Sequence, residues 1–177
     1  MTALPPTAPL REGMTIDGDW GRIEVIETPG HMANHLSFVW RGALFSGDLV
    51  MGWSTSLVSP PDGDMTTFMA SVARLTGRTD RIYYPGHGDP VTEPQARAAA
   101  LLAHRRARES QILTALQKAG PATATEIAQA VYTDVDPALM PAAARNVLAH
   151  LIDLDERNLA RALDAPSADM RFEAISP

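Results

Sequence analysis

The chain has 177 residues, 45% of them hydrophobic, and a formal net charge of −6. This length fits one ordinary domain or two small ones, and the hydrophobic content argues against disorder. The absence of cysteine excludes disulfides and thiolate ligands and favours a cytoplasmic location. The negative charge gives no overall attraction to nucleic acid or to an anionic membrane. No apolar run approaches the ~20 residues needed to span a membrane. The Pro-rich start lacks the features of a signal peptide.

The first 93 residues predict several short strands and one helix. Residues 22–27 alternate apolar and polar side chains, which is typical of a half-buried strand. Residues 36–40 alternate in the same way, and Arg41-Gly42 predicts a two-residue hairpin to a strand at 43–45. After a loop rich in Gly, Pro and Ser, Asp64 is a candidate N-cap for a helix that ends at Gly77. A further short strand is predicted at 82–84.

The composition changes near Pro94, and the rest of the chain predicts mainly helices. Residues 94–119 indicate a long helix that Gly120-Pro121 stops. Thr123-x-x-Glu126 has the spacing of a capping box and begins a short helix. A third helix at about 138–157 and strands at 159–163 and 170–175 complete the order of a winged helix. We therefore predict a domain over residues 1–93, a connecting helix over 94–120 and a winged-helix-like domain over 121–177.

Three of the predicted strands end in a glycine turn that carries a candidate metal ligand. The turns are Thr28-Pro29-Gly30-His31, Ser46-Gly47-Asp48 and Pro85-Gly86-His87-Gly88. A ligand at the end of a strand sits on a rigid element, and the glycine lets the chain turn and aim the side chain inward. Two imidazoles and a carboxylate suit zinc, iron or manganese. The repetition is a much stronger signal than any single histidine.

These motifs resemble the later metal-binding motifs of the metallo-beta-lactamase superfamily. The stretch 104–113, with the winged-helix pattern after it, resembles the branch of beta-lactamase-like hydrolases with a C-terminal winged helix, some of which cleave RNA. The resemblance covers about residues 12–163. It implies an α/β fold in which this chain forms the C-terminal part of an αββα sandwich, followed by the winged helix.

The resemblance also implies a function. His31 would bind the first of two zinc ions, His87 the second, and Asp48 would bridge both and take part in catalysis. A metal-bound hydroxide would then attack an ester, thioester, lactam or phosphodiester. The substrate is expected to be a small molecule or RNA.

The chain departs from the family pattern in one respect. The signature His-x-His-x-Asp-His belongs upstream of His31, and residues 1–30 contain no histidine. We therefore expect a truncated catalytic domain with weak or partial zinc occupancy. A catalytically inactive remnant and a winged-helix module for interaction or nucleic-acid binding are the alternatives.

Loss of half a sandwich would also expose apolar strand residues. Ile23, Val25, Leu36, Phe38 and Leu44 are expected to lose part of their cover, and a sheet edge is expected to stay open. Exposed apolar surfaces and open edges recruit other chains. We therefore expect self-association.

Several other residues have two interpretations. His35 either lines the substrate pocket or sits at a strand end, and Trp53 either forms a wall of that pocket or anchors its loop to the core. Asp62-Gly63-Asp64 fits a turn and helix N-cap better than a cation site. His104 and His150 are expected to be helix-surface or packing residues.

Charge argues against duplex DNA as a partner. Residues 121–177 carry four Arg or Lys against nine Asp or Glu, a net charge of −5. Phosphates repel such a surface. Positive charge gathers on residues 94–119, on Arg97, Arg105, Arg106, Arg108 and Lys118. We expect these side chains to pair with the acidic residues of 121–177. Alternatively, they contact an anionic substrate.

Overall fold

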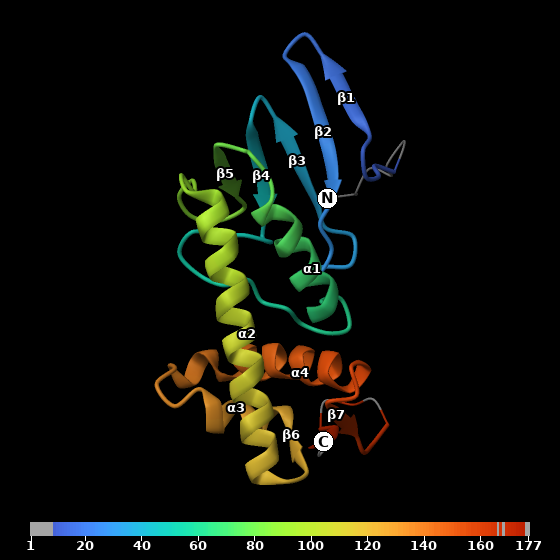
Figure 1. Ribbon diagram of the computed structural model, residues 1–177, viewed down its shortest axis with the longest axis vertical. Coiled ribbons are helices and arrows are strands. Elements are labelled where there is room, and N and C mark those ends of the chain that lie inside the picture. Colours follow the sequence, from blue (N-terminus) through green and yellow to red (C-terminus); the bar gives the residue numbers. More distant parts are fainter. Residues whose placement is uncertain (1–8, 166, 168, 176–177) are drawn as a thin grey trace, which may run out of the picture.

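The computed structural model describes residues 9–165, 167 and 169–175 (Figure 1). Its larger sheet has five strands in the order β1-β2-β3-β4-β5. They are β1 (Thr15–Gly18), β2 (Gly21–Glu27), β3 (Leu36–Trp40), β4 (Ala43–Gly47) and β5 (Ile82–Pro85). Neighbours are antiparallel except β4 and β5, which are parallel. A long loop and helix α1 (Met65–Thr76) connect those two strands.

The hairpin between β3 and β4 and the ends of α1 form at the residues that the sequence predicts. Arg41 and Gly42 both have positive φ, at 50° and 79°, and join β3 to β4 as the expected two-residue hairpin. Asp64 caps α1, since its carboxylate accepts a hydrogen bond from the Thr67 N–H at 2.7 Å. Gly77 is the C-cap of α1. The prediction that Asp62-Gly63-Asp64 forms a turn and cap is confirmed.

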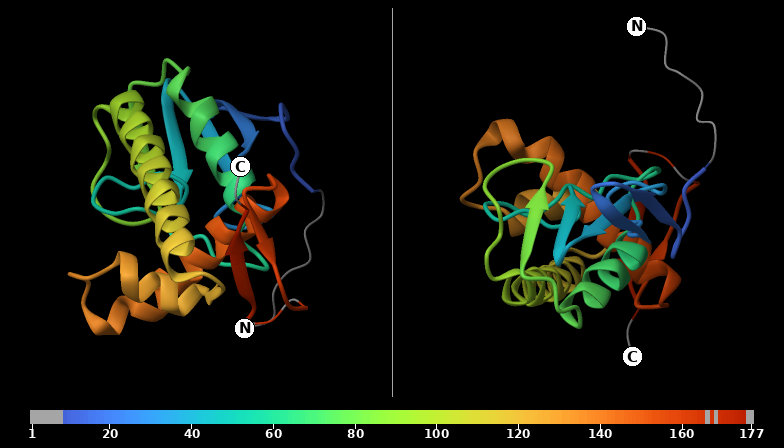
Figure 2. Two further views of the ribbon diagram at one scale, coloured as in Figure 1. Left: turned by 60° about the horizontal axis from the view of Figure 1, so that its bottom comes forward. Right: turned by 90° about the horizontal axis from the view of Figure 1, so that it is seen from above.

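One face of the sheet is covered by helices. Leu44 and Tyr83 point to this face and are fully buried. They share a core with α1 and with the first half of α2 (Pro94–Ala119), which lie on the same side of the strands (Figure 2). The apolar residues of α1 supply much of this core, namely Met65, Phe68, Met69, Val72 and Leu75.

The other face of the sheet is apolar, without a helix layer of its own. Two rows of paired residues cross it. The first row is Ile16, Ile23, Trp40, Ala43 and Ile82, and the second is Val25, Phe38, Phe45 and Tyr84. We call these nine residues the open face. None of them is charged, and Phe45 and Tyr84, with stacked rings 5.5 Å apart, are each 40% exposed.

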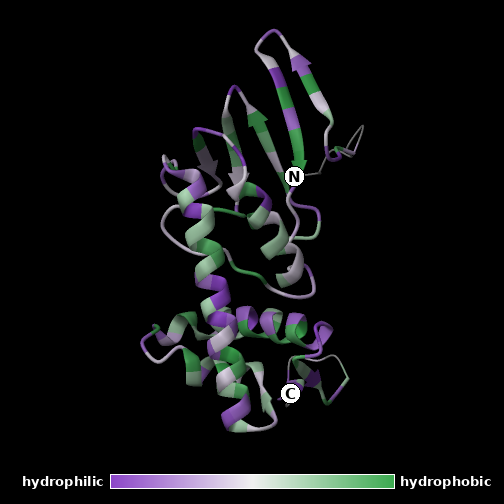
Figure 3. Ribbon diagram, viewed as in Figure 1, coloured by the Kyte–Doolittle hydropathy of each residue, from purple (hydrophilic) through white to green (hydrophobic). Residues whose placement is uncertain are grey.

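Not all of the apolar strand residues that were expected to lose their cover are exposed. Val25 and Leu44 were expected to lose cover, but both are fully buried, and Leu44 lies on the helix-covered side. Ile23, Leu36 and Phe38 are partly exposed. The alternation of apolar and polar residues along β2 is visible in Figure 3. On β3 the helices cover Ser37 and Val39, so Leu36, Phe38 and Trp40 lie on the other side.

The C-terminal part has the predicted winged-helix order. After α2 come β6 (Ala122–Thr123), α3 (Ala124–Val131), a short 3-10 turn (Pro137–Leu139), α4 (Met140–Glu156), β7 (Ala160–Ala162) and β8 (Arg171–Ala174). The strands form a second sheet in the order β6-β8-β7. The capping box of Thr123 and Glu126 is present. The second half of α2 packs into this core, so one helix joins both cores.

Two of the arginines of α2, Arg97 and Arg105, do not contribute to the expected basic face. Arg97 donates to the carbonyls of Met51 and Ser54 at 2.7 and 2.6 Å. Arg105 is 1% exposed and donates to the Ser56 carbonyl. Neither forms an ion pair within the residues that the structure describes. The expected pairing with the acidic module is therefore wrong for these two residues, because backbone carbonyls of the loop after β4 take their donors.

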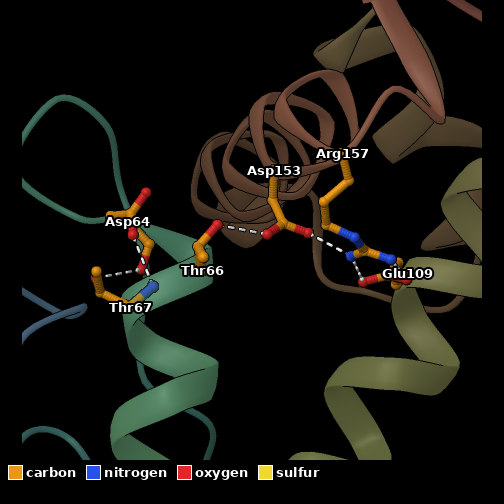
Figure 4. Close-up of polar contacts among 6 residues, drawn as sticks. All are labelled: Asp64, Thr66, Thr67, Glu109, Asp153 and Arg157. Carbon is orange, nitrogen blue, oxygen red and sulfur yellow. Dashed lines mark hydrogen bonds and ion pairs between the residues drawn. The ribbon is translucent and has the colours of Figure 1, made fainter.

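A separate polar network joins the two parts of the molecule (Figure 4). Asp153 of α4 accepts a hydrogen bond from the Thr66 hydroxyl of α1 and pairs with Arg157 at 2.6 Å. Arg157 also pairs with Glu109 of α2 at 2.8 Å. These contacts fix α4 against both α1 and α2.

No helix in the described ranges is long and apolar enough to cross a membrane.

Candidate metal centre

The three glycine turns meet at one edge of the sheet. β2 and β4 run in the same direction because each is antiparallel to β3, and β5 is parallel to β4. The carboxyl ends of all three strands therefore lie along one edge. His31 follows β2, Asp48 follows β4 and His87 follows β5.

Asp48 is the centre of this arrangement. Its Oδ2 atom lies 3.8 Å from Nε2 of His31 and 3.6 Å from Nε2 of His87. Both separations exceed a hydrogen bond. Two donor atoms on one tetrahedral zinc ion, each ~2.0–2.1 Å from it, lie about 3.4 Å apart. The spacing therefore suits an ion between Asp48 and each histidine.

The second carboxylate oxygen of Asp48 also supports a ligand role. Asp48 Oδ1 is buried and has no hydrogen-bond partner in the part of the chain that the structure describes. An unpaired buried carboxylate oxygen is costly. A bound cation would satisfy it.

Glycines make the close approach of the turns possible. A Cβ atom at Gly86 would lie 2.6 Å from Asp48 Oδ1, and one at Gly47 would lie 2.6 Å from Nε2 of His35. Gly30 has φ of +134°, and a Cβ there would lie 2.2 Å from the Cα atom of Phe68. These positions let the ligand turns pack against one another and against α1.

His31 is oriented by a backbone carbonyl. Its Nδ1 atom lies 2.6 Å from the oxygen of Leu57. A carbonyl oxygen can only accept, so Nδ1 carries the proton and Nε2 of the neutral ring keeps its lone pair toward Asp48. Sequence reasoning missed Leu57, because a backbone contact across 26 residues leaves no signal in residue type.

His35 lies beside this ligand. Its ring meets that of His31 edge-on with centroids 6.2 Å apart, and its Nδ1 atom is 2.9 Å from the Thr28 hydroxyl. Burial lowers the pKa of His35 below its usual value, and the nearby His31 makes a smaller contribution in the same direction. His35 therefore supports the turn that holds His31.

Trp53 lies beside His87. It is 71% exposed, and a Cβ at Gly88 would lie 2.5 Å from its ring, so the indole packs on the glycine next to His87. The alternative in which Trp53 anchors its loop in the core is wrong.

A pocket of about 270 Å³ opens on the side of His31 and is lined by Leu57 and Arg145, among others.

The remaining two histidines lie away from this edge. His150 is 1% exposed inside α4, and His104 is exposed on α2, as expected of packing and surface residues. No group of three or more His, Cys, Asp or Glu side chains in the described ranges is compact enough to hold one ion. This is compatible with a bridging Asp48, since His31 and His87 would then serve different ions.

Comparison with known proteins gives the context of this site. Residues 123–168 match the family model described as "Beta-lactamase associated winged helix domain". The chain is similar to the "Beta-lactamase-like protein 2 homolog" of Drosophila melanogaster, with 30% identity over 96% of this chain and 57% of the relative. It also shares 30% identity, over 62% of this chain and 34% of the relative, with "Atrochrysone carboxyl ACP thioesterase dmxR1" of Cryptosporiopsis.

A solved structure agrees with these relatives. A metallo-beta-lactamase family protein from Thermus thermophilus superimposes with a TM-score of 0.80 and 28% identity, covering 97% of this chain and 56% of that chain. The present chain thus spans about half the length of the relatives that match it over nearly all of its residues. The predicted fold, a part of a metallo-beta-lactamase sandwich followed by a winged helix, is confirmed.

Proposed function

The chain belongs to the metallo-beta-lactamase superfamily, in the branch with a C-terminal winged helix, and from this premise we propose that it contributes to a two-zinc hydrolytic centre. The observation that carries the proposal is the position of Asp48 Oδ2 between two imidazole Nε2 atoms, at 3.8 and 3.6 Å. His31 and His87 would each hold one ion, and Asp48 would bridge them. When bound, the ions would activate a water molecule and polarise the scissile group of an ester, thioester, lactam or phosphodiester.

The chain's own residues prepare this centre. Leu57 fixes the His31 ring so that Nε2 faces Asp48, and Trp53 forms a wall beside the more exposed His87. Because two ions need more donors than three side chains supply, further ligands would have to come from outside this set. His104 and His150 cannot supply them from their places on α2 and α4. We propose a small molecule or RNA as the substrate, and a cytoplasmic location on the absence of cysteine.

We expect this chain to bind zinc weakly through these residues. His31→Ala and His87→Ala should each lower zinc affinity by about tenfold or more, because each removes one donor of a small set. Zinc titration against a competing chelator measures this. His104→Ala is the matched control, since His104 is an exposed histidine outside the site. Unchanged affinity in both site variants would contradict the proposed role of these histidines, and two tightly held zinc ions per chain would contradict the expected weak binding.

A nucleic-acid-binding role for the winged helix is disfavoured by its packing. Helix α4 is the one that would enter a major groove. Of its residues only Pro141 and Glu156 are exposed, because α1, α2 and the loop after β4 cover the rest together with the winged-helix core. Its surface charge is also negative. We therefore expect no tight binding to duplex DNA at physiological salt, which a gel-shift titration of the whole chain tests; submicromolar, sequence-selective binding would overturn this.

We also infer that the chain self-associates, and that a second copy covers the open face. The nine residues of this face include no charge, so a twofold-related copy would bring no like charges together. Helices already cover the opposite face. Two copies stacked sheet to sheet would form four layers, with helices outside and apolar side chains between the sheets.

A further inference from the structure

We propose that Asn146 and Arg105 are positioning residues for His31, and that they act by holding the backbone on both sides of Leu57. Asn146 lies on α4 of the winged helix and Arg105 on α2. The winged-helix part would thereby set the orientation of a metal ligand at the edge of the other sheet. The inference rests on the proposed role of His31 as a zinc ligand.

The contact that orients His31 depends on where the Leu57 carbonyl lies. The 2.6 Å hydrogen bond fixes the ring tautomer only while that oxygen stays in place. The Leu57 side chain is 38% exposed, so its own packing holds it weakly. The neighbours Ser56 and Val58 are buried instead, at 1% and 0% exposure.

Both neighbours are bound to the C-terminal helices. The Val58 N–H donates to Oδ1 of Asn146 at 3.0 Å. The Ser56 carbonyl accepts from Nη2 of Arg105, whose Nη1 donates to the same Asn146 oxygen at 3.2 Å. Asn146 is tied to its own helix through Nδ2, which donates to the Ala142 carbonyl at 3.3 Å. The backbone before and after Leu57 is thus fastened to one shared pair of side chains.

Burial makes this fastening rigid. Arg105 is 1% exposed and its guanidinium lies 5.2 Å from the ring centroid of Phe68, so it has little freedom to leave the loop. Arg145 extends the contact by donating to the Ser59 hydroxyl at 2.8 Å. The Leu57 carbonyl therefore has one favoured position, facing His31.

The test uses the tautomer of His31 in the zinc-free chain. In the wild type at alkaline pH, nitrogen-15 NMR of the labelled imidazole should show the proton on Nδ1. Asn146→Ala removes the acceptor of the Val58 N–H and should give a mixture of both tautomers. Asn146→Asp keeps an acceptor oxygen at that place and should retain the wild-type tautomer. Alanine favours helices, so the first variant is expected to fold, and Asn146→Ser gives the same test if it does not.

A matched control separates positioning from general stability. Thr66→Val removes the hydroxyl that bonds to Asp153, and so weakens the contact of α4 with α1 without touching the loop. It should lower the free energy of unfolding but leave the His31 tautomer unchanged. A wild-type tautomer in both Asn146→Ala and Asn146→Ser, or the same mixture in Thr66→Val, would overturn the proposal.

Zinc affinity gives a second readout. Loss of the group that orients a metal-binding histidine costs about 10–100-fold in metal affinity, so Asn146→Ala, which frees the Leu57 carbonyl, should bind zinc at least about tenfold more weakly than Asn146→Asp. Failure of the wild type to bind zinc at all would defeat the proposed function. The tautomer measurement would still decide whether Asn146 positions His31.

Discussion

Replacing His150 with methionine is expected to remove much of the chain's sensitivity to mild acid. His150 is 1% exposed in α4, and neither ring nitrogen has a hydrogen-bond partner among the described residues. Burial lowers its pKa to about 3, and the nearby basic groups of Arg105, Arg108, His104 and Arg157 act in the same direction. The folded protein therefore holds this imidazole neutral where the unfolded chain would charge it.

The sign of the effect follows from proton uptake. Between its unfolded pKa of about 6.5 and its folded pKa of about 3, His150 binds a proton only when the chain unfolds. Stability therefore falls as the pH falls through this window, by about 1 kcal/mol per pH unit. Methionine keeps an adaptable apolar side chain of similar size and cannot take up the proton.

Urea unfolding at a series of pH values between about 7 and 5 measures this slope, above the range in which most carboxylates titrate. His150→Met should show a clearly flatter dependence than the wild type. The exposed His104 is the comparison, and His104→Met should keep most of the wild-type slope. Equal slopes in the wild type and His150→Met would show that His150 is hydrated or paired in solution.

The elements that could be predicted from the sequence are those specified within a few residues. Asp64 and Thr123 cap helices through contacts three residues away, and Arg41-Gly42 forms its hairpin through its own backbone angles. The candidate ligands were found for a related reason. Each follows a strand directly, so the strand directions alone bring His31, Asp48 and His87 to one edge.

Contacts between distant segments could not be predicted in this way. Arg105 carries a charge on a helix, which favours a surface position, yet it is buried, and a loop carbonyl 49 residues away accepts a hydrogen bond from its guanidinium. Which face of β3 the helices cover could not be predicted for a similar reason. Both faces of that strand carry apolar residues, and the packing of α1 and α2 decides which one is covered. Neither outcome depends on the pattern of the segment itself.

The open face predicts a reversible dimer. Five strands at ~4.8 Å spacing make this surface about 20 Å across, and together with the strand length it offers several hundred Å² per chain, in the range of weak and transient interfaces. The weight-average mass from light scattering should therefore rise with concentration toward that of two chains. An association of this size is weak enough to be tuned by a single pair of residues.

Phe45 and Tyr84 are that pair, because they are the most exposed of the nine residues and stack on each other at 5.5 Å. Phe45→Lys with Tyr84→Lys would place four ammonium groups in the apolar layer of a dimer, and burying an unpaired charge costs several kcal/mol. The double variant should be monomeric at every concentration at which the wild type is dimeric. Leu139→Lys is the control, since Leu139 is also exposed, at 58%, but lies in the short 3-10 turn of the C-terminal part. A wild-type chain that stays monomeric, or an assembly that survives the double substitution, would show that a second copy does not cover this face.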